Sequence, residues 1–242
     1  MISTLKTTLL VAIISLTASI AHAQSASLTH VFPQVVDGVG SDGTVYTSRF
    51  LIVSSGGPDA TCQVSLFDIG AERLSAGDSI LVPGTSFATI TTRGEDAIDT
   101  GYARLDCSEP VFASLTYSIL SANGTTSGIA MVPSAPVAAF ALIPMVLNGR
   151  YRYGIAMAND TDAAQLVVLL FDSGATSLVK TIQLQPRSQW VAFVDEIFNV
   201  PTTGLGRLRI GAVDDSGPDN FYITALLFDQ DGVTNVVPAV IR

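Results

Sequence analysis

The phrase QVSLFDIG at residues 63–70 is echoed by VVLLFDSG at residues 167–174. Each phrase is a short run of apolar, β-branched and aromatic residues that ends in Phe-Asp and a glycine. This pattern is typical of a β-strand that leads into a turn. If the similarity reflects an internal repeat, further pairs of similar segments should follow in the same order along the chain.

Further pairs of similar segments follow one another in the same order, at a nearly constant separation. These pairs are SRFLIVSSGG (48–57) and YRYGIAMAND (151–160), ILVPGTSFATI (80–90) and QLQPRSQWVAF (183–193), YARLDC (102–107) and LGRLRI (205–210), and IAMVPSA (129–135) and TNVVPAV (234–240). FPQVVDG (32–38) and IPMVLNG (143–149) lie further apart, because a loop rich in Gly, Asp and Thr at residues 39–46 is inserted in the first copy.

The segments between the turns predict an all-β fold. Turn clusters such as SSGGPD, DIGAE and SANGTTSG separate the apolar runs, and no stretch shows sustained helical periodicity. We predict two tandem antiparallel β-sandwich (Ig-like) domains from an internal duplication, at residues 24–134 and 137–242. The prolines of Pro133-Ser134-Ala135-Pro136 make the connection between them short and stiff.

Hydrophobic patterning predicts which faces of the strands are covered. In ATCQVSLFD (60–68) apolar and polar residues alternate, which indicates a sheet with one wet face. VVLLF (167–171) has lost this alternation, and we expect it to be covered on both faces. Phe87 aligns with Trp190, and a large aromatic residue in both copies favours a place in each core.

The first 23 residues are predicted to be a signal peptide. Lys6 precedes the apolar run from Leu9 to Ile20, and Ala21-His22-Ala23 is a small-x-small cleavage site. The run is short for a membrane anchor, and no later segment reaches the length of a membrane span. We therefore expect a secreted, periplasmic or cell-surface protein.

The charge balance restricts the partners. The chain has 12 Lys and Arg against 21 Asp and Glu, and removal of Lys6 would make it more acidic. Such a surface repels phosphate, so no nucleic-acid partner is expected. An extracellular protein or a polysaccharide is the expected partner, and the oligomeric state stays open.

The two cysteines of an exported chain are expected to form a disulfide. Cys62 and Cys107 align with Leu166 and Ile210, which suggests that one domain crosslinks a contact that the other only packs. Two buried free thiols are the alternative. The charged residues also recur: Asp68 matches Asp172, and Arg104 matches Arg207. An ion pair that supports the fold in each copy is the favoured interpretation.

Residues for catalysis or metal binding are scarce, so we predict no enzyme, no metal and no cofactor. After cleavage only His30 remains among the histidines, and we expect it to be solvated at the start of the first strand. One histidine and two bridged cysteines cannot form a zinc or copper site. The loops DDSGPDN (214–220) and DQDGVTN (229–235) carry oxygen ligands, so calcium stays open, although both are ordinary turn sequences.

A candidate ligand face is the stretch Arg150-Tyr151-Arg152-Tyr153. On a strand the two arginines would share one face and the two tyrosines the other. Flat aromatic faces can stack on sugar rings, whereas tyrosines of a sandwich can equally line the core or the contact between domains. Both interpretations remain open from the sequence.

The short motifs FPQVVDG, SLFD, VPGTS and GYARL, repeated as IPMVLNG, LLFD, QPRS and GLGRL, resemble a type of secreted bacterial β-sandwich repeat. The second copy departs from that pattern at its opening. The resemblance implies an accessory or surface module with no catalytic residues to carry over. We therefore expect a non-catalytic exported protein that acts in surface adhesion, assembly or ligand presentation. The alternatives are a carbohydrate-binding protein and a hydrolase that uses carboxylates alone.

Overall fold

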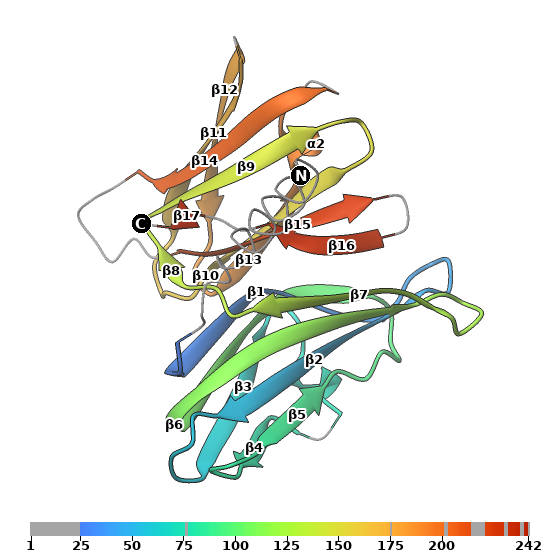
Figure 1. Cartoon of the computed structure of the whole chain (residues 1–242), viewed down its shortest axis with the longest axis vertical. Coiled ribbons are helices and arrows are strands. Elements are labelled where there is room, and N and C mark those ends of the chain that lie inside the picture. Colours follow the sequence, from blue (N-terminus) through green and yellow to red (C-terminus); the bar gives the residue numbers. More distant parts are fainter. Residues whose placement is uncertain are drawn as a thin grey trace, which may run out of the picture.

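The computed structural model describes residues 25–75, 77–174, 176–200, 203–213, 221–229, 232–237 and 240–241. The predicted signal peptide lies outside these residues. The described chain is almost entirely β, as expected, with one short 3-10 helix, η1 (Ala71–Arg73), and one α-helical turn, α2 (Val194–Ile197). Figure 1 shows two β-rich halves stacked along the long axis of the molecule.

The N-terminal half is one antiparallel sheet that folds into two layers, because its longest strand, β6 (Asp99–Leu120), belongs to both. We call the first layer sheet A; it has the order β4 (Ser79–Val82), β3 (Ala60–Phe67), the first part of β6, and β1 (Ser27–Val39). Sheet B has the order β5 (Phe87–Thr91), β2 (Val45–Ser54), the last part of β6, and β7 (Thr126–Pro133).

The C-terminal half is a sandwich of two separate antiparallel sheets. Sheet C has the order β12 (Thr176–Leu184), β11 (Gln165–Ser173), β14 (Gly204–Ala212), β9 (Phe140–Leu147) and β17 (Val240–Ile241). Sheet D has the order β13 (Ser188–Phe193), β10 (Arg152–Asn159), β15 (Phe221–Asp229) and β16 (Gly232–Val237), with the short β8 (Val137–Ala138) beside β15. Sheet C therefore has the strand order of sheet A, and sheet D that of sheet B.

The predicted disulfide is confirmed. Cys62 on β3 and Cys107 on β6 are direct partners in the sheet, with a sulfur–sulfur distance of 2.08 Å. Their predicted counterparts, Leu166 and Ile210, are wrong. Leu166 points out of the sandwich and is 46% exposed, and Ile210 pairs with Leu169 instead. In a strand, a shift of one residue in an alignment moves a side chain to the opposite face.

The register of the sheets identifies the true counterparts. Phe32 pairs with Ala103 in sheet A, and Ile143 pairs with Leu208 in sheet C. Counting from these two pairs, the position of the disulfide corresponds to Val167 and Ala212, which are direct partners on β11 and β14. Val167 lies in the core of the C-terminal half, so an apolar contact replaces the crosslink there.

The halves pack against each other through the outer faces of sheets A and D. Val31 and Tyr102 of sheet A are buried together with Ala158 of sheet D, and Phe67 and Tyr222 pack beside them. Leu226 of sheet D is buried in the core cluster of the N-terminal half, although its strand belongs to the other half. Figure 1 shows β1 and β7 on the side of the N-terminal half that faces sheet D. We call this contact the seam.

Candidate binding surfaces

Polar side chains of both halves meet at the seam around Asp160. This carboxylate is nearly buried and accepts hydrogen bonds from Tyr102, from Arg104 (3.0 Å) and from Arg187 (2.7 Å). Tyr102 and Arg104 belong to β6, whereas Arg187 precedes β13. Burial and the neighbouring Asp160 raise the pKa of the Tyr102 hydroxyl, so it stays a neutral donor. The arrangement joins the two halves across the seam through one nearly buried carboxylate.

The prediction of matching ion pairs is only half correct. Arg207 pairs with Asp172 at 3.2 Å in the C-terminal half, as expected. In the N-terminal half, Asp68 accepts a hydrogen bond from the backbone N–H of Gln189 across the seam, and Arg104 turns to Asp106 and Asp160. Asp68 and Arg104 therefore do not pair with each other, and both contact residues of the C-terminal half.

The expectation that His30 is solvated is wrong. Its side chain is only 3% exposed, because it lies on the same side of β1 as the core residue Phe32 and not on the seam side, where Val31 lies. The Val111 carbonyl can only accept, so His30 Nε2–H donates to it at 2.9 Å, and Nδ1 accepts from the Ser134 hydroxyl at 2.8 Å. Burial lowers the pKa of His30 and keeps the ring neutral. The residue joins β1 to the connection between the halves.

The stretch Arg150–Tyr153 does not lie on one strand as predicted. β10 begins at Arg152, so Tyr151 precedes it. Tyr153 is in the core of the C-terminal half, and its hydroxyl accepts from Val146 N–H at 2.7 Å and donates to the Val146 carbonyl. Tyr151 remains partly accessible, with the Arg150 guanidinium 5.3 Å from its ring centroid. A face of two adjacent exposed tyrosines is therefore not formed.

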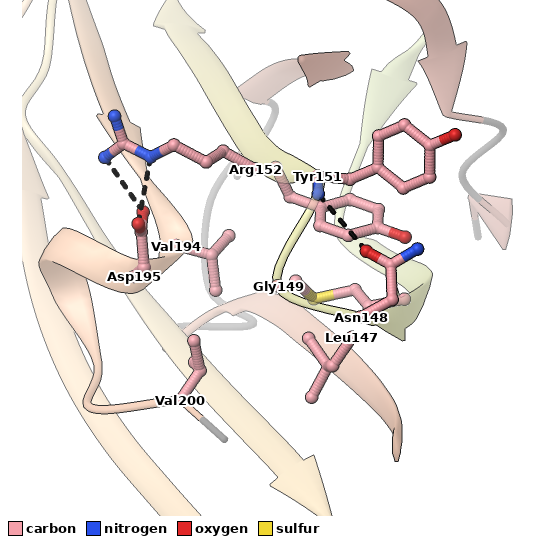
Figure 2. A pocket seen from close by; sticks show the side chains of 10 residues that line it. Leu147, Asn148, Gly149, Tyr151, Arg152, Val194, Asp195 and Val200 are labelled. Atoms are coloured by element: carbon pink, nitrogen blue, oxygen red, sulfur yellow. Dashed lines mark hydrogen bonds and ion pairs between the residues drawn. The ribbon is translucent and has the colours of Figure 1, made fainter. Parts of the chain in front are cut away.

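A shallow pocket of about 190 Å³ lies beside Tyr151. Figure 2 shows the pair of Arg152 and Asp195 on one side of it and Tyr151 with Asn148 on the other. Asn148 accepts hydrogen bonds from the backbone N–H groups of Arg150 and Tyr151, which orders the turn. The floor consists of apolar side chains. They are Met145, Leu147, Val194 and Val200.

Arg152 has its charge compensated at the rim of this pocket. It donates to Asp195 at 2.9 Å and to Glu196 at 2.8 Å, and these hydrogen bonds raise its pKa. Its guanidinium also stacks on Phe193 at 3.7 Å from the ring centroid. A neutral ligand with hydroxyl groups suits this pocket better than an anion, because no unpaired cation of the pocket faces it.

The outer face of sheet C carries apolar side chains that no described residue covers. Leu166, Val168 and Leu170 point outward from β11, and the core-facing side chains alternate with them. Val179 on β12 pairs with Leu170 and is 66% exposed. The expectation that VVLLF is covered on both faces is therefore wrong for the described residues. The sequence pattern is typical of a strand covered on both faces, but within the described ranges nothing covers the outer face of β11.

Sheet B also carries exposed apolar side chains on its outer face. Phe112, Val53 and Phe87 are direct neighbours across β6, β2 and β5, and Phe87 is 62% exposed. The prediction that Phe87 lies in the core is thus wrong. Trp190 packs against the core of the C-terminal half beside Met157, so the two aromatic residues are on opposite faces of their strands.

The described residues offer no group of three or more His, Cys, Asp or Glu side chains that could hold a metal. The candidate calcium loop 214–220 and residues 230–231 of the second loop lie outside the described part of the chain. None of the helices within the described ranges has the length and apolar character that a membrane-spanning helix requires.

No protein-family model and no curated protein matches the chain. Among solved structures, Thermotoga maritima 1070 is similar at 12% identity over 43% of this chain and 91% of its own, with a TM-score of 0.32. The tandem CBM22-1–CBM22-2 domain of Paenibacillus barcinonensis Xyn10C has 12% identity over 84% and 80% of the two chains, with a TM-score of 0.23. The Pleurotus ostreatus lectin has 9% identity over 93% and 81%, also with a TM-score of 0.23. At such TM-scores we base no inference about the function on these structures.

Proposed function

We propose that this chain is an exported, non-catalytic assembly protein of two Ig-like β-sandwiches that arose by duplication. The observation that carries the proposal is the uncovered apolar face of sheet C. Leu166, Val168, Leu170 and Val179 form its centre. On β14 the ion-paired Arg209 borders it beside Leu170, and Gly211 separates Val168 from Phe140 of β9. A contiguous apolar patch of this kind marks an interaction site on a protein surface.

Duplication is supported by the strand orders and by the register. Both halves have the same two orders of strands, and the repeated phrases fall on corresponding strands once the register is counted from Phe32 and Ile143. The disulfide supports export, because such bonds persist in oxidising compartments. The cell surface and the periplasm are both oxidising compartments, so either location fits the disulfide.

A non-catalytic role is supported by the surroundings of the reactive groups. The ring nitrogens of His30 are both engaged in hydrogen bonds inside the protein. The carboxylates that meet at the seam, Asp106 and Asp160, are both paired with Arg104. A hydrolase that uses two carboxylates needs them to face a substrate, and these two face an arginine instead.

Retention of the protein on cells tests this function. We would express the full chain in a bacterial host and compare it with the variant Leu166→Lys/Val179→Lys, which places two charges on the apolar face. The wild-type protein is expected to remain with washed cells or to cluster them, and the variant to be released. The control is Leu81→Lys, a similarly exposed position on β4. Equal retention of the variant and the wild type would contradict the proposal.

Carbohydrate binding is the second candidate, and the pocket at Tyr151 favours it. An accessible aromatic ring beside an amide and an apolar floor can stack on a sugar ring and bind its hydroxyl groups. Titration of soluble polysaccharides into the protein and into Tyr151→Ala would test it. Loss of binding in Tyr151→Ala, with binding kept in Leu166→Lys/Val179→Lys, would support this site. No heat of binding with any polysaccharide would remove it.

A further inference from the structure

The two Asn-Gly steps of the chain lie at the tips of two hairpin turns. Asn148-Gly149 connects β9 to β10, and Asn123-Gly124 connects β6 to β7. Both asparagines are exposed, and both glycines have a positive φ, which is 70° at Gly149 and 80° at Gly124. A glycine leaves its backbone nitrogen open to close approach, because it has no Cβ. The side chain of the preceding asparagine can therefore react with this nitrogen.

The turn at Asn148 holds the side-chain carbonyl in surroundings that favour attack on its carbon. Oδ1 accepts hydrogen bonds from the backbone N–H of Arg150 at 3.0 Å and of Tyr151 at 3.2 Å. These donors polarise the carbonyl and would stabilise the negative charge that develops on the oxygen during attack, as in an oxyanion hole. Figure 2 shows the oxygen on this contact and the amide nitrogen turned away from it. Within the described ranges nothing accepts a hydrogen bond from that nitrogen, so it is free to leave as ammonia.

The attacking group is the backbone nitrogen of Gly149. No described residue accepts a hydrogen bond from its N–H, whereas the N–H of Gly124 donates to the Ser121 carbonyl at 2.7 Å. Oδ1 of Asn123 also has donors, which are the Ser121 hydroxyl and the N–H and hydroxyl of Thr125. The two sites therefore differ chiefly in the nitrogen, which has to give up its proton to attack. At Gly124 a hydrogen bond that stabilises the N–H has to break first.

We infer that Asn148 is a site of spontaneous modification, where the side chain closes onto the backbone and is converted to aspartate and isoaspartate. The Gly149 nitrogen forms a bond with Cγ of Asn148, and the bond between Cγ and Nδ2 breaks. The proton of the Gly149 N–H ends on the departing nitrogen, which leaves as ammonia. Water then opens the succinimide ring at one of its two carbonyl carbons, which gives aspartate or isoaspartate. The reaction consumes only water, so it is independent of both proposed functions.

The modification would change the pocket beside Tyr151. Aspartate adds a negative charge at the rim, and isoaspartate lengthens the backbone of the turn by one atom. Because the N–H of Tyr151 donates to the side chain that reacts, the tyrosine would lose its present support. The turn would thus record the age of the protein as a change at this pocket.

Asn159 serves as the internal control for an asparagine whose amide is held. Its side chain is fully buried, and Nδ2 donates to the carbonyls of Ala163 at 2.7 Å and of Gln185 at 2.9 Å. The next residue, Asp160, also carries a Cβ, which hinders approach to its nitrogen. We expect no reaction at Asn159 in the folded protein.

Peptide mapping by mass spectrometry of the purified, disulfide-bonded protein, aged in a mildly alkaline buffer, tests the inference. Asn148 is expected to show the mass change of deamidation, with isoaspartate among the products and one oxygen taken up from isotopically labelled water. Its rate should exceed that of Asn123 by about fivefold, which corresponds to about 1 kcal/mol in the activation barrier. In urea with a reductant the two rates should become equal, because neither turn is then held.

Gly149→Ala and Gly124→Ala are matched variants, because each hinders the nitrogen beside one asparagine. Gly149→Ala should slow the reaction at Asn148 and leave Asn123 unchanged, and Gly124→Ala should do the reverse. The same comparison in urea is valid even for a variant that does not fold. Equal rates at Asn148 and Asn123 in the folded protein, or an Asn148 that stays unmodified, would overturn the inference. A rate difference that persists in urea would overturn it too, since the fold would then not be the cause.

Discussion

Replacing Asp160 with asparagine tests whether the seam contributes to the stability of the whole molecule. The carboxylate is only 5% exposed and pairs with Arg104 from one half and Arg187 from the other. Asparagine keeps the size of the side chain but removes the negative charge between the two guanidinium groups. The change is therefore aimed at the electrostatic contact and leaves the packing of the halves in place.

The expected cost follows from burial and from the partners that remain. Removing one member of a buried ion pair costs about 3–5 kcal/mol. Here Arg104 and Arg187 are 33% and 36% exposed and keep Asp106 and Asp162, so neither charge is left without a partner. We expect a loss of about 2 kcal/mol in the free energy of unfolding. For a chain of this size that is a fall of roughly 4–8 °C in melting temperature.

Calorimetry and urea unfolding followed by the fluorescence of Trp190 would measure this change. The matched control is Asp195→Asn, which removes a carboxylate from an exposed pair with Arg152 while Glu196 remains. That control should lose less than about 1 kcal/mol. If Asp160→Asn is no less stable than Asp195→Asn, the seam does not stabilise the molecule as argued.

Three further predictions concern the disulfide, the buried histidine and the core. Cys62→Ala/Cys107→Ala removes a crosslink between residues 45 positions apart, and the free energy of unfolding in urea should fall by at most about 4 kcal/mol. Wild-type protein treated with a reductant should show the same loss. Burial lowers the pKa of His30 below 6.5, so the unfolded chain binds more protons than the folded protein just below that pH. The free energy of unfolding of the wild type should therefore fall as the pH drops below 6.5. His30→Gln should show a flatter pH dependence when urea unfolding is measured at a series of pH values. Leu226→Ala should cost about 2–5 kcal/mol and lower the unfolding temperature of the N-terminal half, where its side chain is buried, as seen by calorimetry.

The fold class and the crosslink could be predicted because they depend on local patterns. Short apolar runs between glycine-rich turns predicted the strands, and two cysteines in a chain with a predicted signal peptide predicted the bond between Cys62 and Cys107. Alignment by letters failed at the level of single residues. It aligned Cys62 with Leu166 and Phe87 with Trp190, although the two side chains of each pair point to opposite faces of their strands.

The binding surfaces could not be predicted in the same way, because they depend on contacts between distant parts of the chain. His30 is buried because it lies on the core-facing side of β1 with Phe32 and bonds with Val111, which is 81 residues further along the chain. Asp160 meets Tyr102 across the seam, and no pattern in the sequence links these two positions. Tyr153 could not be assigned to the core or to a ligand until its hydroxyl was seen to bond with Val146.

The outward side chains of β3 and β11 show how coverage and composition are related in this chain. On β3 the outward residues Thr61 and Gln63 are polar and exposed, whereas Phe67 is apolar at the end of the strand that meets the seam. Apolar outward residues on this strand therefore occur where another sheet covers them. On β11 the outward residues Leu166 and Leu170 are apolar, yet no described residue covers them. Under the proposed assembly function, another molecule covers these side chains.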